Sequence, residues 1–593
     1  MTSAKTDTTT AGRFRELTWW ERQQLERQGC TSPDWHLVRI TDDTDLDLIR
    51  HVEFEGAVSI GSLNAEKWPG CGIFRATLQS CAIGDGVRIK NVSGAIKNAV
   101  IEDEVTIENV GRIEFEPEAT CGIGLKVAVL DETGSRPVPI YPGLSSQTAT
   151  LMAREPRLAA DHIIPQTLAH IESLPQNNTI GSNARIIDCG QLINVAVGPE
   201  VRVEGARRLA NGSIINNAAP GKAIAFVGNG VDADGFIIED GIVDAGALLR
   251  NCYVGQGARI EKGFTAHDSL FFANSTLENG EACAVLAGPY TVSMHKGTLL
   301  IGSQTSFMNA GSSTNQSNHM YKLGPVHWGL LERGVKTASN SYLMHGAAIG
   351  AFSLLMGSHK THPNSTEFPF SYLFGDAQGA TVVVPAMMLR SCGLMRDEMK
   401  WPSRDRRLKR KLPIHDKIVF EVLNPYTISR ILTALDTIAE LIHLPADDDR
   451  FIRYKGMKIS RASLERAKKF YTLAVYKYLR ERLPDACFPE EAATDEKAMA
   501  MEWLDLGGLI LTREALDRAK AADSVEEREK IFSEAYENYP DLEREWILGR
   551  FDEHWRVSPE RIKLYAEEFD NLVEEDRATY RESIHAENEM LRL

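Results

Sequence analysis

The sequence of 593 residues lacks the features that mark membrane, secreted and thiolate-metal proteins. No stretch approaches the roughly 18 consecutive apolar residues that would span a bilayer. The first ten residues contain neither an apolar run nor a basic stretch, so they do not resemble a signal peptide. The nine cysteines are odd in number and show no CxxC spacing, which argues against a disulfide framework and a thiolate zinc site. These absences predict a protein of the reducing cytoplasm that is not associated with a membrane.

Basic residues are fewer than acidic residues, and the formal net charge is −16. An acidic surface is repelled by phosphate backbones, so we expect no nucleic-acid partner. The sequence contains no P-loop, no nucleophile elbow and no HExxH motif. The one local exception in charge is the basic run at 404–411, "RDRRLKRK".

What the sequence does contain is a period of six residues. Aliphatic or small residues recur at this spacing in the series Ile83, Ile89, Ala95, Ile101, Ile107 and Ile113. The same period returns between 180 and 215 and between 231 and 272. Neither a helix nor an isolated hairpin has this period, which is typical of hexapeptide repeats. The stretches "VIEDEVTIENV" and "CYVGQGARIEKG" resemble the hexapeptide-repeat superfamily, and this resemblance implies a mainly β protein built on a left-handed parallel β-helix.

The pattern changes at both ends of the chain. Thr18 and Glu21 form a capping-box pattern before a short helix that Gly29 can close. Beyond Asn424 and Pro425 the apolar residues fall at threes and fours, which predicts an α-helical region. We therefore predict five units: an N-terminal tail and helix at 1–50, a first β-helix segment at 51–113, a partly helical excursion at 114–179, the main β-helix at 180–411 and an α-helical domain at 412–593.

Histidine is concentrated in one window, which holds seven of the fifteen histidines: His267, His295, His319, His327, His345, His359 and His362. Histidine is the usual general base near neutral pH. We predict a site here with His327, His295, His319 and Glu332 as catalytic residues. Neutral and charged neighbours are predicted to bind substrate, namely Asn309, Asn315, Gln316, Asn318, Lys322, Arg333, His359 and His362. The basic run supplies predicted contacts to cofactor phosphates, namely Arg404, Arg407, Lys409 and Arg410.

The superfamily resemblance also implies a chemistry. Most of its enzymes are acyltransferases, in which a histidine deprotonates an acceptor that attacks an acyl thioester. The chain is accordingly expected to transfer an acyl group to a sugar or sugar nucleotide, with acyl-CoA or an acyl carrier as co-substrate and no tightly bound cofactor or metal. Two alternatives remain open, a metal-dependent enzyme of the gamma carbonic anhydrase kind and a non-catalytic ligand-binding or scaffold protein. A homo-oligomer, with a trimer favoured, is expected in the catalytic cases.

A closer resemblance rests on three segments, "LTWWERQQLERQGCTSPDW", "SFMNAGSSTNQSNHMYKLGPVHWG" and "GSHKTHPNSTEFPFSYL". Together they resemble a family of large bacterial β-helix proteins that carries a domain-of-unknown-function label. Its members are loosely described as related to sugar-nucleotide pyrophosphorylases, which implies a shared fold rather than a shared reaction.

Overall fold

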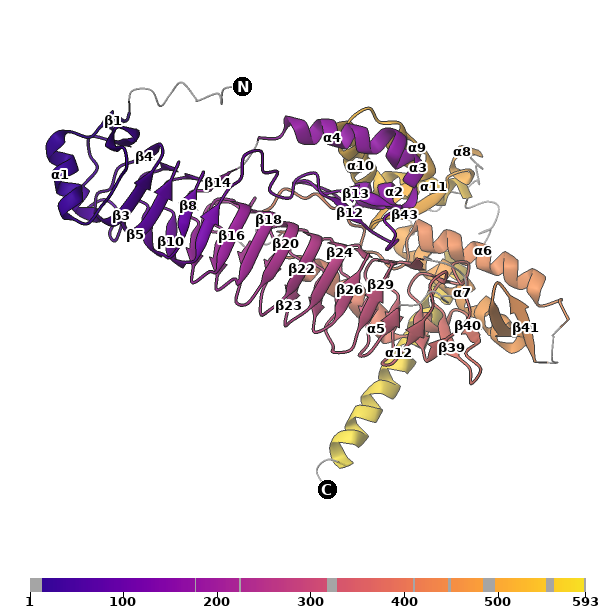
Figure 1. Ribbon diagram of the computed structural model, residues 1–593. Helices are drawn as coiled ribbons and strands as arrows, with labels where there is room; N and C mark the ends of the chain where they lie inside the picture. Colours follow the sequence, from indigo (N-terminus) through magenta and orange to yellow (C-terminus); the bar gives the residue numbers. More distant parts are fainter. Residues whose placement is uncertain are drawn as a thin grey trace.

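The computed structural model describes residues 13–175, 178–222, 225–316, 328–408, 411–445, 450–483, 496–550 and 559–590. Within these described residues, 40 strands form one large, mostly parallel sheet, which extends along the long axis of the molecule in Figure 1. Helices dominate the C-terminal region and lie at one end of this sheet. The mainly β architecture with a helical C-terminal region is thus confirmed.

Strand pairing follows from the six-residue period. Strand β7 (Arg88–Val92) pairs in parallel with β10 (Thr106–Val110), so that Ile89 lies opposite Ile107, three repeats later. Strand β10 pairs in turn with β15 (Arg185–Ile187), which places Ile186 next to Ile107. All three isoleucine side chains are fully buried. Strands three repeats apart in this run therefore lie side by side, and the aliphatic residues stack into a continuous core that no single repeat could bury.

Stacked polar residues hold the turns between these strands. Asn91, Asn109 and Asp188 all adopt the left-handed backbone conformation, which Asn and Asp tolerate better than most residues. The Asn91 amide donates to Asn109 Oδ1 at 3.0 Å, and the Asn109 amide donates to Asp188 Oδ1 at 2.9 Å. Each of these Asn side chains thus permits a turn and donates a hydrogen bond to the corresponding side chain in the neighbouring turn.

The helix near the N-terminus has the predicted cap. Helix α1 (Trp19–Arg27) follows Thr18, and the reciprocal hydrogen bonds of a capping box join Thr18 and Glu21. Gly29 follows the helix with φ of 79°, as expected for a residue that ends a helix in the left-handed conformation.

An excursion leaves the sheet after β11 (Arg112–Glu114) and returns at β14 (Thr179–Ile180). It contains the hairpin of β12 (Lys126–Ala128) and β13 (Pro137–Pro139). Its helices are α2 (Ser146–Arg154), α3 (Pro156–Leu158), the π-helical turn η3 (Ala159–Ile163) and α4 (Ile164–Ser173). Pairing across the excursion remains in register, so its two ends lie close together.

The C-terminal region continues from the end of the sheet. Strand β39 (Tyr372–Gly375) pairs antiparallel with β40 (Thr381–Val384), and β40 pairs with β42 (Met457–Ser460), which forms a hairpin with β41 (Phe451–Tyr454). Helices α6 (Pro425–Leu441) and α7 (Arg461–Arg482) pack on each other, and α12 (Pro559–Met590) packs on α7. None of the helices in the described part of the chain combines the length and hydropathy needed to cross a lipid bilayer.

The excursion packs against this C-terminal region, as Figure 1 shows for α2 to α4 beside α9 (Arg513–Ala521) and α10 (Val525–Glu537). The Ser146 backbone N–H donates to Asp416 Oδ1 at 2.7 Å, and the Gln147 amide donates to the Gly507 carbonyl at 2.9 Å. The Thr148 hydroxyl donates to Glu529 Oε1 at 2.7 Å. Segments separated by more than 250 residues are therefore joined through buried hydrogen bonds.

Candidate ligand-binding site

A cavity of about 400 Å³ lies between one face of the sheet and helix α5 (Cys392–Ser403). We call it the basic pocket. Four paired strands build its floor: β25 (Thr276–Glu278), β28 (Val292–Ser293), β31 (Asn309–Ala310) and β34 (Lys336–Thr337). Register places Thr276, Val292, Asn309 and Lys336 in one row across these strands. The parallel sheet thus brings together residues that are far apart in the sequence.

The lining is strongly cationic. It contains one carboxylate, Asp397, and five cationic side chains, namely Lys336, Arg396, Lys400, Arg404 and Arg406. Asp397 forms an ion pair with Lys336 and lies 3.5 Å from an Arg396 nitrogen. Burial, together with the neighbouring charges of Arg404 and Arg396, lowers the pKa of Lys400. The cations repel one another, so an anion placed among them would be held electrostatically.

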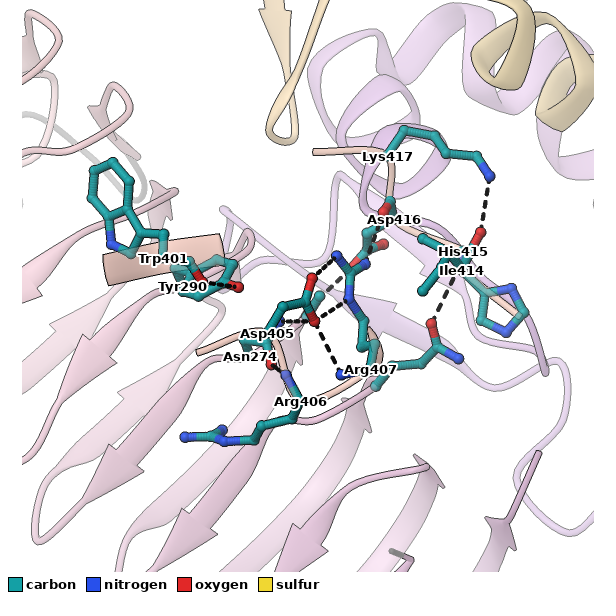
Figure 2. Close-up of polar contacts among 12 residues, drawn as sticks. Asn274, Tyr290, Trp401, Asp405, Arg406, Arg407, Ile414, His415, Asp416 and Lys417 are labelled. Atoms are coloured by element: carbon teal, nitrogen blue, oxygen red, sulfur yellow. Dashed lines mark hydrogen bonds and ion pairs between the residues drawn. The ribbon is translucent and has the colours of Figure 1, made fainter. Parts of the chain in front are cut away.

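Aromatic side chains form the second wall of the basic pocket. The rings of Tyr290 and Phe307 stack with centroids 5.6 Å apart, and Trp401 lies 4.7 Å from Phe307. The Tyr290 hydroxyl donates to the Trp401 carbonyl at 2.9 Å, which joins the sheet to α5 (Figure 2). The pocket therefore combines a cationic side with an apolar, aromatic side.

Three residues predicted from the sequence meet in this pocket: His295, Asn309 and Arg404. The first two were predicted to act on substrate and the third to contact a cofactor. All three side chains are exposed to solvent. Residues predicted to act on substrate and a residue predicted to contact a cofactor thus line one cavity, and His295 supplies an imidazole group there.

Four of the five cations in the basic pocket were not predicted from the sequence, namely Lys336, Arg396, Lys400 and Arg406. Arg396, Lys400 and Arg404 follow one another at intervals of four, which places them on one face of α5 and its C-terminal end. Like charges at this spacing destabilise a helix, so the three cations on one helix face could have indicated a site from the sequence. Lys336 carried no such signal because only the strand register brings it to the pocket.

The predicted phosphate-binding run divides between different environments. Arg404 lines the pocket, whereas Arg407 is buried and forms two hydrogen bonds to Asp405, at 3.0 and 2.7 Å (Figure 2). Arg407 also donates to the Asp416 carbonyl at 2.8 Å. Arg406, half-buried, donates to the Gly257 carbonyl at 2.5 Å and also lines the pocket. Arg407 therefore joins Asp405 to Asp416, while Arg404 and Arg406 face the cavity. The predicted residues Lys409 and Arg410 lie outside the described residues.

Other predicted residues lie elsewhere or outside the described part. Glu332 and Arg333 line a separate cavity of about 340 Å³ on the other side of Phe307. His319, His327, Asn318 and Lys322 fall in the segment 317–327, outside the described residues.

Four further predicted residues lie near the end of the sheet, three of them on strands. Gln316 pairs with Leu343, which pairs with His359, so these three side chains form one buried column. His359 Nδ1 lies 3.0 Å from the Thr381 hydroxyl. Burial lowers the pKa of His359 to about 4. Within the described structure, His359 is thus a neutral core residue.

Asn315 is half-buried and lies opposite Tyr342. His362 is exposed, and its Nδ1 lies 2.6 Å from the His345 carbonyl oxygen. Neither residue lines the basic pocket. Across the described ranges, no group of three or more His, Cys, Asp or Glu side chains comes close enough to hold a metal ion.

Comparison with known proteins places this architecture in a family. A family model described as "Domain of unknown function (DUF4954)" matches residues 14–442, well over half of the chain. The chain belongs to this family. The DUF4954 match covers the sheet except β41 and β42, together with the excursion, α5 and α6, and therefore all residues that line the basic pocket.

One relative is similar over most of the chain. An "Uncharacterized protein" of Treponema pallidum (strain Nichols) is 25% identical over 466 residues, which are 71% of this chain and 61% of that protein. The chain thus spans less than two thirds of the length of this relative.

Proposed function

We propose that this DUF4954 member is a transferase of the hexapeptide-repeat type, built on a left-handed parallel β-helix. It would move an acyl group from a thioester, carried by coenzyme A or an acyl carrier, to a sugar or sugar-nucleotide acceptor. The observation that carries the proposal is the basic pocket, where five cations, an aromatic wall and the His295 imidazole line one cavity. Support for the repeat type comes from the six-residue period and from the pairing of strands three repeats apart in the first run.

The pocket matches the chemistry of a phosphate-bearing substrate. Lysine and arginine are the residues that proteins use to hold phosphate groups, and arginine can do so with two parallel hydrogen bonds. The half-buried ring of Trp401 suits the flat face of a nucleotide base. Coenzyme A thioesters and sugar nucleotides both carry a diphosphate and a base, so either fits this lining.

In the proposed reaction, His295 acts as the general base. Its neutral imidazole takes the proton from an acceptor hydroxyl, whose oxygen attacks the thioester carbonyl. The new C–O bond forms, the C–S bond breaks, and the departing thiolate receives the proton from the imidazolium. An exposed imidazole at the pocket can reach a substrate without a change of fold.

Calorimetry would test the binding step. Acetyl-coenzyme A and a uridine diphosphate sugar would be titrated into the full-length protein and into a variant with Lys400→Glu and Arg404→Glu. The matched control carries Arg39→Glu and Arg50→Glu, which makes the same change in net charge on exposed positions near the N-terminal end of the sheet. We expect binding to be lost in the pocket variant and kept in the control. Equal binding by both variants, or no binding by the wild type, would refute the proposal.

Catalysis would be tested separately, by measuring thiol release from acetyl-coenzyme A in the presence of the acceptor. His295→Ala should abolish release while leaving the melting temperature within about 2 °C of the wild type, because an exposed side chain contributes little to stability. Retained turnover in His295→Ala would remove His295 from the mechanism. A stoichiometric metal in the purified protein would instead favour the metal-dependent alternative.

A trimer is proposed as the functional assembly. Light scattering on the purified full-length protein would measure the mass in solution. A monomer at micromolar concentration would contradict this part of the proposal.

A further inference from the structure

The second cavity, which we call the junction pocket, lies where four parts of the fold meet. Its 340 Å³ are enclosed by the strands around β30 (Ser303–Thr305) and β33 (Gly329–Leu331), the C-terminal end of α2, helix α6 and the hairpin of β43 (Trp503–Leu506) and β44 (Leu509–Thr512). The proposed transfer reaction makes no use of it. Its lining brings together charged groups that are rarely buried side by side.

Three arginines reach this pocket from three separate elements. Arg154 comes from the end of α2 and donates to Gln304 Oε1 at 2.9 Å. Arg430 comes from α6, and its Nη2 lies 3.7 Å from Glu332 Oε1. Arg333 follows β33 on the sheet. The convergence of three guanidinium groups on one small cavity is a property of the tertiary fold.

Arg333 supplies the observation that points to a ligand. Its side chain is fully buried, and its Nη2 donates to the Val419 carbonyl at 2.5 Å. Its Nε lies 3.8 Å from Asp505 Oδ2, and its guanidinium lies 5.0 Å from the Phe307 ring centroid. Within the described structure, Nη1 and Nε have no hydrogen-bond acceptor. Buried donors without acceptors are costly, and an oxyanion in the cavity would satisfy them.

Glu332 does not cancel this positive charge. It is buried, and its Oε2 accepts a hydrogen bond from the Ala351 backbone N–H at 3.1 Å. Burial raises the pKa of Glu332, while Arg430 and a hydrogen bond from Tyr426 act in the opposite direction. The lining thus holds three arginines against two carboxyl groups, Glu332 and Asp505, so positive charge remains in excess.

The remaining lining defines the rest of the ligand. Hydroxyl and amide groups face the cavity from both the sheet and the loop at 364–366, namely Gln304, Thr305, Ser306, Asn364 and Thr366. Trp328 adds an aromatic ring. Neutral hydrogen-bonding groups beside an aromatic ring suit a sugar, and the planar guanidinium fork suits a carboxylate. The volume lies at the lower end of the range for ligand pockets, which fits a small molecule.

We propose that the junction pocket is a second ligand site, specific for a small polyhydroxylated carboxylic acid such as a sugar acid. The carboxylate lies against Arg430 and Arg333, and the hydroxyl groups contact the neutral lining. This site is independent of the basic pocket, because no residue lines both cavities.

Paired ligands that differ in the carboxylate would test the site. Glucuronate, galacturonate and gluconate would be titrated by calorimetry into the full-length protein, alongside the neutral compounds glucose, galactose and glucitol. We expect at least one acid to bind, and to bind about tenfold or more tightly than its neutral partner, because a charge-assisted pair is lost in the latter. Absence of binding by all three acids, or equal binding of acid and neutral partner, would overturn the proposal.

Two variants separate this site from the basic pocket. Arg430→Gln removes a partly exposed guanidinium, so folding should tolerate it, and it should weaken the acid about tenfold or more. Arg404→Gln, which alters the basic pocket alone, should leave acid binding unchanged. Loss of acid binding in Arg404→Gln but not in Arg430→Gln would assign the acid to the other cavity and refute the inference. Failure of the transfer reaction would not affect this result.

Discussion

His359 allows a quantitative test of its place in the core. Its side chain is fully buried in the column with Leu343, and burial lowers its pKa from an ordinary value of 6.5 to about 4. In the unfolded chain the imidazole takes up a proton as the pH falls through 6.5, whereas in the folded chain it stays neutral down to about pH 4. The unfolded state therefore binds more protons in this window, and stability falls as the pH falls.

The size of the effect follows from these two values. The difference between the two pKa values corresponds to about 3 kcal/mol in the free energy of unfolding, of which about 2 kcal/mol is lost between pH 7 and pH 5. The variant His359→Asn keeps a polar group beside the Thr381 hydroxyl but removes the titration. We expect the variant to be less stable than the wild type at pH 7, because smaller side chains leave a cavity, and to lose about 2 kcal/mol less on acidification.

Denaturant unfolding of both proteins at pH 7 and pH 5 would measure this difference. Leu343→Ala is the matched control, since it disturbs the same buried column without changing a titratable group. It should lower stability equally at both pH values and keep the wild-type pH dependence. If His359→Asn shows the same loss between pH 7 and pH 5 as the wild type, the reasoning about burial of a neutral imidazole is wrong.

Three further predictions concern Glu332, Arg407 and Gly111. Burial raises the pKa of Glu332 above its ordinary value of 4.5, so the folded state holds a proton that the unfolded state loses. The stability of the protein should therefore fall as the pH rises above 4.5. Glu332→Gln should reduce this fall, as measured by melting curves at pH 5 and pH 8. Arg407→Ala leaves the buried Asp405 unpaired and should cost about 3–5 kcal/mol in denaturant unfolding, much of it recovered by adding Asp405→Asn. Gly111→Ala would place a Cβ 1.9 Å from the Gly190 carbonyl oxygen, so its melting temperature should fall clearly, whereas Gly393→Ala on α5 should melt like the wild type.

The sequence predicted the repeating core well because the repeat is local. Ile89 and Ile107 are separated by three units of six residues, and the structure pairs them directly. Capping also depends on near neighbours, and Thr18 with Glu21 forms the expected box. The pairing of Ile107 with Ile186 could not be predicted, because the intervening excursion carries no signal for the register at which the chain returns.

The pockets were harder to predict because they depend on distant segments. The floor residues Thr276, Val292, Asn309 and Lys336 are separated by unequal intervals, so no single period selects them. In the same way, Arg154, Arg333 and Arg430 meet only because the excursion and helix α6 pack on the sheet. The predicted window from His267 to His362 contributes residues to both cavities, and tertiary packing divides them between the two.

The packing of the excursion has a consequence for synthesis of the chain on the ribosome. Eight residues of α2, Ser146 to Ala153, are buried, and their partners include Asp416, Gly507 and Glu529. During translation, the sheet can start to form as soon as its first strands emerge. The residues that cover this face of α2 are synthesised several hundred residues later. The nascent protein therefore displays an uncovered helix for tens of seconds at elongation rates of roughly 5–20 residues per second. A chaperone that binds exposed apolar segments would find its target in the excursion rather than in the sheet.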